Sequence, residues 1–229
     1  MKSDTDIVKP RTFPSDTASV AIVDDHPLVR EGLSIRISNQ PDLKVVGDAA
    51  TVEEGLELAQ REQPDLMVVD ISLKEGHGLD LIKRVRAILP KTKFLVLSCH
   101  QDSLYAERSL RAGALGYLNK QESNERVLEA IRMVLAGKRC ISTEITQKLL
   151  DQAIDKPKAK HGSVESLSDR ELEIFRMIGD GMTSSNIANR LIISIHTLDT
   201  HRENIKRKLG LRNANELTRA AVQWMIESR

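Results

Sequence analysis

The chain of 229 residues is poor in cysteine and has no long hydrophobic run. Cys99 and Cys140 are its only cysteines, and neither has a histidine partner at the spacing of a zinc site. We therefore expect free structural thiols in a reducing compartment, not a disulfide or a metal site. No apolar run approaches the roughly 20 residues that cross a bilayer, and the polar start does not resemble a signal peptide. The sequence accordingly predicts a cytoplasmic protein with no membrane partner.

The chain also lacks an excess of either charge, since 34 basic and 33 acidic residues leave a formal net charge of +1. This balance excludes neither nucleic acid nor protein as a partner, because a local basic stripe can act within a balanced total. A length of 229 residues with 40% hydrophobic residues suits two domains of modest size.

Composition and periodicity divide the chain into a leader (1–18), an α/β domain (19–140), a connecting helix with a linker (141–166) and a helical domain (167–229). The leader is polar, contains Pro10 and Pro14 and shows no periodicity, so we expect it to be disordered. Apolar residues at helical spacing between Ile145 and Ile154 predict the connecting helix. The linker after it is rich in Lys, Pro, Gly, His and Ser, as expected of a flexible hinge.

Short apolar runs alternate with amphipathic segments in the α/β domain. The runs expected to form strands are Val20–Val23, Val45–Val46, Leu66–Val69, Phe94–Leu97 and Tyr117–Leu118. A helical pattern follows each run, and Thr51 with Glu54 forms a capping box before one of these helices. Strict alternation with right-handed crossovers predicts an α/β doubly wound fold with a five-stranded parallel sheet.

Acidic residues follow two of these runs: Asp24 and Asp25 come after the first, and Asp70 comes after the third. Because ligands of doubly wound sheets bind beyond the carboxyl ends of the strands, we expect the three carboxylates on one rim. There they would repel one another and raise each other's pKa values unless a hard divalent cation lay among them. The arrangement predicts a Mg²⁺ site of Asp24, Asp25 and Asp70, completed by the backbone carbonyl of Ser72.

Ser98 and Lys120 bring a hydroxyl and an ammonium group to the same rim, because each follows a later apolar run. Side chains of these types on one rim can accept and bind a phosphoryl group. Asp70 is the candidate nucleophile that becomes an acyl phosphate, while Lys120 pairs with a phosphoryl oxygen and Ser98 donates a hydrogen bond. Taken singly, each acid can also be a strand cap and Lys120 a solvated lysine, but the order of all five residues favours the phosphoryl site.

Two other chemistries fit this rim less well. Aspartyl-phosphate hydrolases of the haloacid-dehalogenase type carry a second Asp two residues after the nucleophile, where this chain has Ser72. A nucleotide-binding flavodoxin-like domain needs a glycine-rich loop after its first strand, and acidic residues stand there instead. The sequence therefore favours a regulatory domain that accepts a phosphoryl group over an enzyme.

Residues 19–140 resemble the receiver domain of two-component response regulators. The resemblance rests on the order of an acidic pair, an acceptor, a hydroxyl residue and a lysine, namely Asp24, Asp25, Asp70, Ser98 and Lys120. It implies that a histidine kinase phosphorylates Asp70, that the chain can assist its own phosphorylation and dephosphorylation, and that Ser98 and Tyr117 move together on phosphorylation. Lys74 stands where the family usually has proline, so we expect a freer loop and altered kinetics.

The last segment is predicted to be all helix, and its caps mark four helices. The opening caps are Ser168 with Glu171, Thr183, Ser194, and Asn213 with Glu216, and the glycine stops are Gly181 and Gly210. The second and third of these helices have the lengths of a helix-turn-helix motif, with one face of the third free for recognition.

Residues 165–227 resemble the LuxR-type helix-turn-helix domain. The family pattern is carried by Leu167, Ser168, Arg170, Glu171, Gly181, Ile187, Ala188, Ser194, Thr197, His201, Ile205, Lys208, Leu209 and Gly210. Joined to a receiver-like domain, this pattern describes the NarL/FixJ family of transcription regulators. The resemblance implies a phosphorylation-dependent DNA-binding regulator, which dimerises with a second copy when phosphorylated. Its implied partners are a histidine kinase, double-stranded DNA and RNA polymerase.

The third helix of this domain carries the candidate DNA contacts. They are His196, Thr197, Asp199, Thr200, Arg202, Glu203, Lys206, Arg207 and Lys208. Asp199 and Glu203 stand where the family usually has basic or small residues. Phosphates would repel Asp199, but its carboxylate can accept a hydrogen bond from cytosine N4, and we hypothesise cytosine readout. Thr200 would touch a thymine methyl, while His196 and Thr197 would contact phosphates near the helix N-terminus.

Two further interpretations of the third helix stay open. A basic run of this kind is often only a solvated helix face. Alternatively, the acidic residues Asp199 and Glu203 suit a module that binds another protein. Salt dependence distinguishes such a module from a DNA-binding one, because phosphate contacts release counterions.

Overall fold

The structure is a computed structural model that describes residues 17–73, 75–99, 103–155 and 162–227. Most of the predicted leader, Lys74 and the first part of the predicted linker lie outside these ranges. None of the helices in the described part is long and apolar enough to span a membrane.

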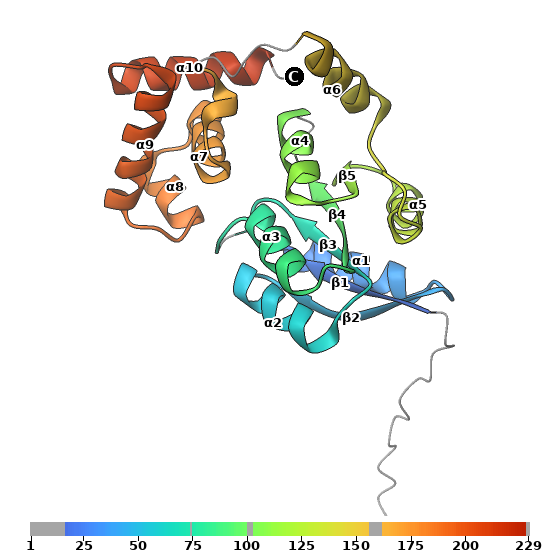
Figure 1. The fold of residues 1–229 in the computed structure, drawn as a ribbon. Helices are drawn as coiled ribbons and strands as arrows, with labels where there is room; N and C mark the ends of the chain where they lie inside the picture. Colours follow the sequence, from blue (N-terminus) through green and yellow to red (C-terminus); the bar gives the residue numbers. More distant parts are fainter. Residues whose placement is uncertain (1–16, 74, 100–102, 156–161, 228–229) are drawn as a thin grey trace, which may run out of the picture.

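The first part of the chain forms a parallel sheet with helices on both faces, here called the N-terminal domain (Figure 1). Its elements are β1 (Ala18–Val23), α1 (Pro27–Ser38), β2 (Leu43–Ala49), α2 (Val52–Glu62), β3 (Leu66–Asp70), α3 (Gly78–Ile88), β4 (Lys93–Ser98), α4 (Ser103–Ala112), β5 (Gly116–Asn119) and α5 (Asn124–Leu135). The strand order is β2-β1-β3-β4-β5, and all neighbouring strands are parallel. The predicted doubly wound, five-stranded fold is confirmed.

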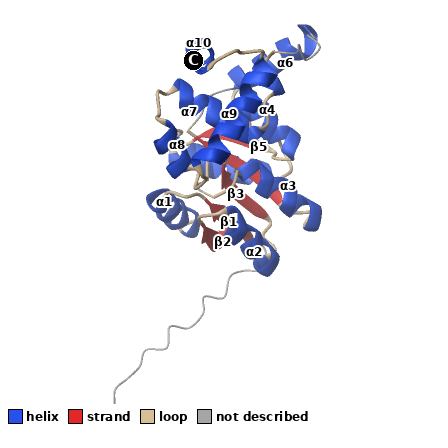
Figure 2. Ribbon diagram, turned by 90° about the vertical axis from the view of Figure 1, so that its left-hand side faces the viewer, coloured by secondary structure: helices blue, strands red, loops and turns tan. Residues whose placement is uncertain are grey.

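Alternate residues of each strand supply the two layers of the core. In β1, Val20 and Ile22 pack beneath α1 and α5, whereas Ala21 and Val23 pack beneath α2, α3 and α4. Both faces of the strand are therefore buried, which explains why it reads as a continuous apolar run. Figure 2 shows the helices on either side of the sheet.

Strand and helix ends differ from the predictions by a few residues. Strand β1 begins at Ala18, inside the predicted leader, because Ala18 pairs with Leu43 and donates its amide to the carbonyl of Asp42 at 3.0 Å. In the predicted capping box, Thr51 Oγ1 accepts from the amide of Glu54 at 3.2 Å. The carboxylate of Glu54 accepts from the amide of Ala50, not from that of Thr51.

The rest of the described chain is helical, and its last four helices are here called the C-terminal domain. The elements are α6 (Thr143–Asp155), the 3₁₀ turn η1 (Val164–Ser166), α7 (Asp169–Gly179), α8 (Ser184–Arg190), α9 (Ile195–Leu209) and α10 (Ala214–Glu227). The predicted connecting helix is α6, which packs against α4 of the N-terminal domain. Before α6, the buried residue Cys140 forms a parallel bridge with Gly116 of β5.

The capping residues begin and end the helices of the C-terminal domain as predicted. Ser168 and Glu171 form a reciprocal capping box on α7, and Thr183 and Ser194 cap α8 and α9 through their hydroxyl groups. Gly210 ends α9 with a φ of +70°, a left-handed conformation that favours glycine. These caps fix the turn between α8 and α9, from which the predicted recognition helix projects.

Candidate functional site

The pairing of the strands brings the predicted acidic residues together at one end of the sheet. Val23 of β1 lies level with Val69 of β3, so Asp24 and Asp25 follow β1 beside Asp70 at the end of β3. Strands β1 and β3 flank the point where the strand order reverses, which is where doubly wound folds bind ligands. The three residues are only 2%, 9% and 4% exposed, in the same order.

Lys120, which follows β5, forms ion pairs with two of these carboxylates. Its ammonium group lies 2.6 Å from Asp70 Oδ2 and 2.5 Å from Asp24 Oδ2. The backbone amide of Lys120 donates to the carbonyl of Ser98, which ties the ends of β4 and β5 together on the same rim. Burial opposes the charge on Lys120, but the carboxylates of Asp70 and Asp24 outweigh it and raise the pKa of Lys120.

The positive charge of Lys120 does not offset the effects of burial and of Asp24 on the pKa of Asp70. Burial raises the pKa of Asp70 to about 6, Lys120 opposes this shift, and the neighbouring charge of Asp24 adds to it. A divalent cation among these oxygens would stabilise the ionised form. The donor set therefore suits a hard cation.

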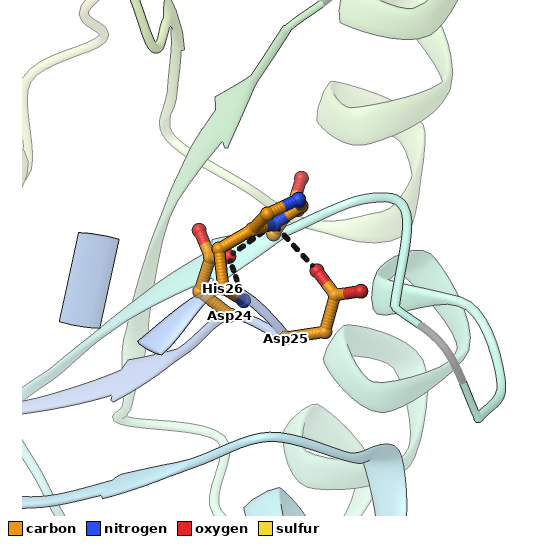
Figure 3. A group of neighbouring side chains, drawn as sticks. Asp24, Asp25 and His26 are labelled. Carbon is orange, nitrogen blue, oxygen red and sulfur yellow. Dashed lines mark hydrogen bonds and ion pairs between the residues drawn. The ribbon is translucent and has the colours of Figure 1, made fainter. Parts of the chain in front are cut away.

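His26 belongs to the same group, although sequence reasoning did not assign it a role (Figure 3). Its Nδ1 lies 3.1 Å from Asp24 Oδ1 and 2.7 Å from Asp25 Oδ1. Ligand atoms of Asp24, Asp25, His26 and Asp70 all lie within 4.8 Å of one another. Asp25 Oδ1 is buried, and its contact with His26 Nδ1 does not have the geometry of a hydrogen bond. A buried carboxylate oxygen without a hydrogen bond at this point fits a cation ligand.

The loop after Asp70 returns close to the strand that it leaves. The amide of Ser72 donates to Asp70 Oδ1 at 3.3 Å, and the amide of Gly78 donates to the carbonyl of Ile71 at 2.9 Å. A Cβ atom on Gly78 would stand 1.9 Å from the carbonyl oxygen of Asp70, so only glycine fits there. The predicted effect of Lys74 lies outside the described residues.

The predicted switch residues Ser98 and Tyr117 are both buried in the N-terminal domain. Ser98 ends β4 level with Asn119 of β5, next to the backbone of Lys120. Tyr117 belongs to the core layer beneath α2, α3 and α4. Their coordinated movement stays a prediction.

The C-terminal domain covers this rim through α7, a contact that the sequence did not indicate. Asp169 at the start of α7 pairs with Lys83 of α3 at 2.9 Å and with Arg108 of α4 at 2.8 Å. Arg108 also donates to the carbonyl of Leu167 at 2.8 Å. These contacts hold the first turn of α7 against the N-terminal domain.

A cavity of about 80 Å³ lies between the two domains next to Asp70. Its walls on the N-terminal side include His26, Asp70, Ser72 and Cys99, and those on the C-terminal side include Glu173, Arg176, Asp180 and Arg190. Glu173 pairs with Arg170 at 2.8 Å, and burial raises the pKa of Glu173 to about 7 against the opposing charge of Arg170.

The predicted recognition helix α9 is anchored by two buried residues, Leu198 and Ile205. The opposite side is accessible: His196, Thr197, Asp199, Thr200, Glu203 and Arg207 are exposed. This face is therefore free while the two domains are in contact. A DNA role for these side chains stays a prediction.

The basic residues of α9 divide by their contacts within the chain. Lys208 pairs with the buried carboxylate of Glu171 at 2.6 Å, and Arg202 donates to Ser184 Oγ of α8 at 2.6 Å. Lys206 pairs with Glu203 at 2.8 Å. Arg207 donates only to Asn204 on its own helix within the described chain. Lys208 and Arg202 thus bind side chains of other helices, whereas Arg207 is exposed on the accessible side of α9.

Comparisons with known proteins agree with the two-part fold. The sequence matches the family model of the response regulator receiver domain over residues 20–132 and that of the bacterial regulatory proteins of the luxR family over residues 165–221. The Fimbriae Z protein of Salmonella typhimurium is 32% identical over 200 residues, which cover 87% of this chain and 94% of that protein. The oxygen regulatory protein NreC of Staphylococcus aureus is 32% identical over 209 residues, covering 89% and 96%.

Solved structures share the fold of this chain over part or most of its length. A two-component response regulator of the LuxR family from Aurantimonas sp. SI85-9A1 aligns with a TM-score of 0.57 and 33% identity, covering 60% of this chain and 99% of that one. RcsB from Salmonella enterica serovar Typhimurium, bound to promoter rprA with the phosphomimetic BeF₃⁻, shares the fold with a TM-score of 0.59 and 23% identity, covering 89% and 97%. With its acidic rim and its capped helix-turn-helix, the chain belongs to the two-component response regulators that join a receiver domain to a LuxR-type DNA-binding domain.

Proposed function

We propose that a histidine kinase transfers a phosphoryl group to Asp70 and that this modification controls DNA binding through α9. The observation that carries the proposal is the convergence of Asp24, Asp25, Asp70 and Lys120 on one buried rim. A carboxylate oxygen of Asp70 would attack the phosphorus of a phosphohistidine, so that a P–O bond forms while the P–N bond breaks. The imidazole of the kinase leaves and takes up a proton.

Asp70 meets the two requirements of a nucleophile at this position. With a pKa of about 6, most of it is ionised at neutral pH. Lys120 holds Oδ2 of Asp70, and the amide of Ser72 holds Oδ1, so the carboxylate is oriented before the donor arrives. After transfer, Lys120 pairs with a phosphoryl oxygen and Ser98 donates a hydrogen bond to another.

Asp24, Asp25 and Asp70, with the carbonyl of Ser72, would hold Mg²⁺ beside the acceptor. When bound, the ion neutralises charge on the phosphoryl oxygens during transfer. His26 Nδ1 is close to two of these carboxylates. Because Mg²⁺ prefers oxygen ligands, the imidazole is expected to turn away when the ion binds.

The accessible side of α9 supports the DNA-binding half of the proposal. On that exposed side, Asp199 and Thr200 would contact bases, and His196, Thr197 and Arg207 would contact phosphates. Homodimer formation on phosphorylation and contact with RNA polymerase belong to the same proposal, and family membership supports them.

The proposal is tested by selecting genomic DNA fragments with the purified full-length protein, with and without beryllofluoride as a mimic of the phosphoryl group. A discrete motif that the mimic enriches, and whose binding weakens steeply with salt, is the expected outcome. Failure to bind DNA in both states at every salt concentration would contradict it and point to a protein partner for α9.

A further inference from the structure

The cavity between the two domains brings positive charge from the C-terminal domain to the acceptor. Asp70 lies on one wall, and Arg176 of α7 and Arg190 at the end of α8 lie on the opposite wall. The volume of about 80 Å³ has room for several oxygen atoms of the size of water. A group carried by Asp70 can therefore extend between the domains.

Arg176 and Arg190 are the two arginines that line this cavity among the described residues. Among the described residues, neither has an ion pair within 4 Å or a side-chain hydrogen bond, although the charge of Arg190 helps to lower the pKa of Glu173 against the effect of burial. Arg170, by contrast, is bound to Glu173 and to the carbonyl of Leu191. Guanidinium groups without partners beside a cavity suit an anion, because their planar donors match the oxygens of a phosphoryl group.

Two carboxylates of the same cavity oppose an anion only weakly. Glu173 is paired with Arg170 at 2.8 Å, and burial raises its pKa to about 7 against the charges of Arg170 and Arg190, so it opposes an anion less than a free carboxylate would. Asp180 and Arg190 are both exposed, so solvent screens both of these charges, whereas Arg176 is half-buried. The cavity therefore retains a net attraction for a doubly charged anion.

We infer that Arg176 and Arg190 complete the phosphoryl site from the C-terminal domain by pairing with phosphoryl oxygens on Asp70. The inference rests on the proposed function, because it requires Asp70 to be the acceptor. Asp70 is almost fully buried, so the domains separate when the kinase delivers the group. The phosphoryl group then holds them together with the outer face of α9 still accessible.

The experiment measures beryllofluoride affinity of the full-length protein in the presence of Mg²⁺, using the ¹⁹F signal of the bound form. The variants are Arg176→Gln, Arg190→Gln and the double variant, and Arg219→Gln on the exposed side of α10 is the matched control. Each single variant is expected to bind roughly tenfold more weakly, as for the loss of one charge-assisted hydrogen bond. Arg176→Lys is expected to restore part of the affinity, and Arg219→Gln to leave it unchanged.

Small-angle X-ray scattering without beryllofluoride separates an anion contact from a structural one. We expect the double variant to match the wild type before the mimic is added. Equal beryllofluoride affinity in the double variant and the wild type would overturn the inference, as would a double variant whose domains are already apart. If the wild type itself binds no beryllofluoride, the proposed function fails, which is a different result.

Discussion

The ammonium group of Lys120 lies 2.6 Å from Oδ2 of Asp70, although 50 residues separate them in the chain. This ion pair is the only cation contact of Asp70 among the described residues, and burial still raises the pKa of Asp70 to about 6. The acceptor is therefore mostly ionised at neutral pH but takes up its proton at a higher pH than an ordinary aspartate. Any change in the cations around it should move that balance.

Replacing Lys120 with Gln should raise the pKa of Asp70 further above 6, because the charge that opposes the shift is lost. Adding Mg²⁺ to the wild type should lower this pKa, because the cation favours the carboxylate. Carbon-detected NMR titration of the Asp70 carboxyl group measures both shifts, and Lys138→Gln on the exposed turn after α5 serves as control. A pKa of Asp70 that responds to neither change would show that these groups do not interact.

Asp169 is expected to hold the two domains together. The Asp169→Ala change leaves Lys83 without its interdomain partner and Arg108 with only the carbonyls of Glu165 and Leu167, and it should weaken the contact by about 1 to 3 kcal/mol. The radius of gyration, measured by small-angle X-ray scattering, should increase. Asp80→Ala is the matched control, because Asp80 contacts Lys83 at 3.4 Å within the N-terminal domain. If both variants scatter like the wild type, Asp169 does not anchor α7.

Two neighbouring basic residues of α9 should respond differently to substitution. Lys208→Ala leaves the buried carboxylate of Glu171 without its cation and should destabilise the C-terminal domain by about 1 to 2 kcal/mol. Trp224, the only tryptophan and a neighbour of Phe175, reports this unfolding by its fluorescence. Arg207→Ala should leave stability unchanged but reduce the salt slope of DNA binding by about 1. A stability loss in Arg207→Ala together with a reduced salt slope in Lys208→Ala would show that Arg207 is the structural residue and Lys208 the DNA contact.

Asp199 is accessible on α9 and should discriminate between bases. If it accepts a hydrogen bond from cytosine, Asp199→Ala should weaken binding to the selected motif by about 1 to 3 kcal/mol and lose the preference at one position. Affinities for the motif and its single-base variants measure this. Tighter binding to every sequence alike would mean that Asp199 only repels phosphates.

The local features of this chain were predictable because each depends on neighbours in sequence. Apolar runs indicated the five strands, and hydroxyl caps such as Ser168 and Ser194 indicated where helices begin. The convergence of Asp24, Asp25 and Asp70 followed from the geometry of parallel strands, because their carboxyl ends meet on one rim. Strand β1 extended past its apolar run to Ala18, since pairing with β2 continues there.

Contacts between the domains were not predictable in the same way. The pairing of Asp169 with Lys83 and Arg108 joins residues that are 86 and 61 positions apart, and no periodicity encodes it. The burial of Glu173 and the position of Arg176 beside Asp70 depend on this docking. His26 was passed over because its exposed ring gives no sign in sequence that it lies between two carboxylates.

The most direct test of the account compares DNA affinity of the wild type and the Asp70→Asn variant, each with and without acetyl phosphate and Mg²⁺, on one fragment that carries the selected motif. We expect acetyl phosphate to tighten binding of the wild type by roughly tenfold, within the usual range of coupling between two sites, and to leave Asp70→Asn unchanged. Intact mass should show the added phosphoryl group on the wild type alone. An acyl phosphate on Asp70→Asn, or an equal response of both proteins, would contradict the assignment of Asp70 as the acceptor that controls DNA binding.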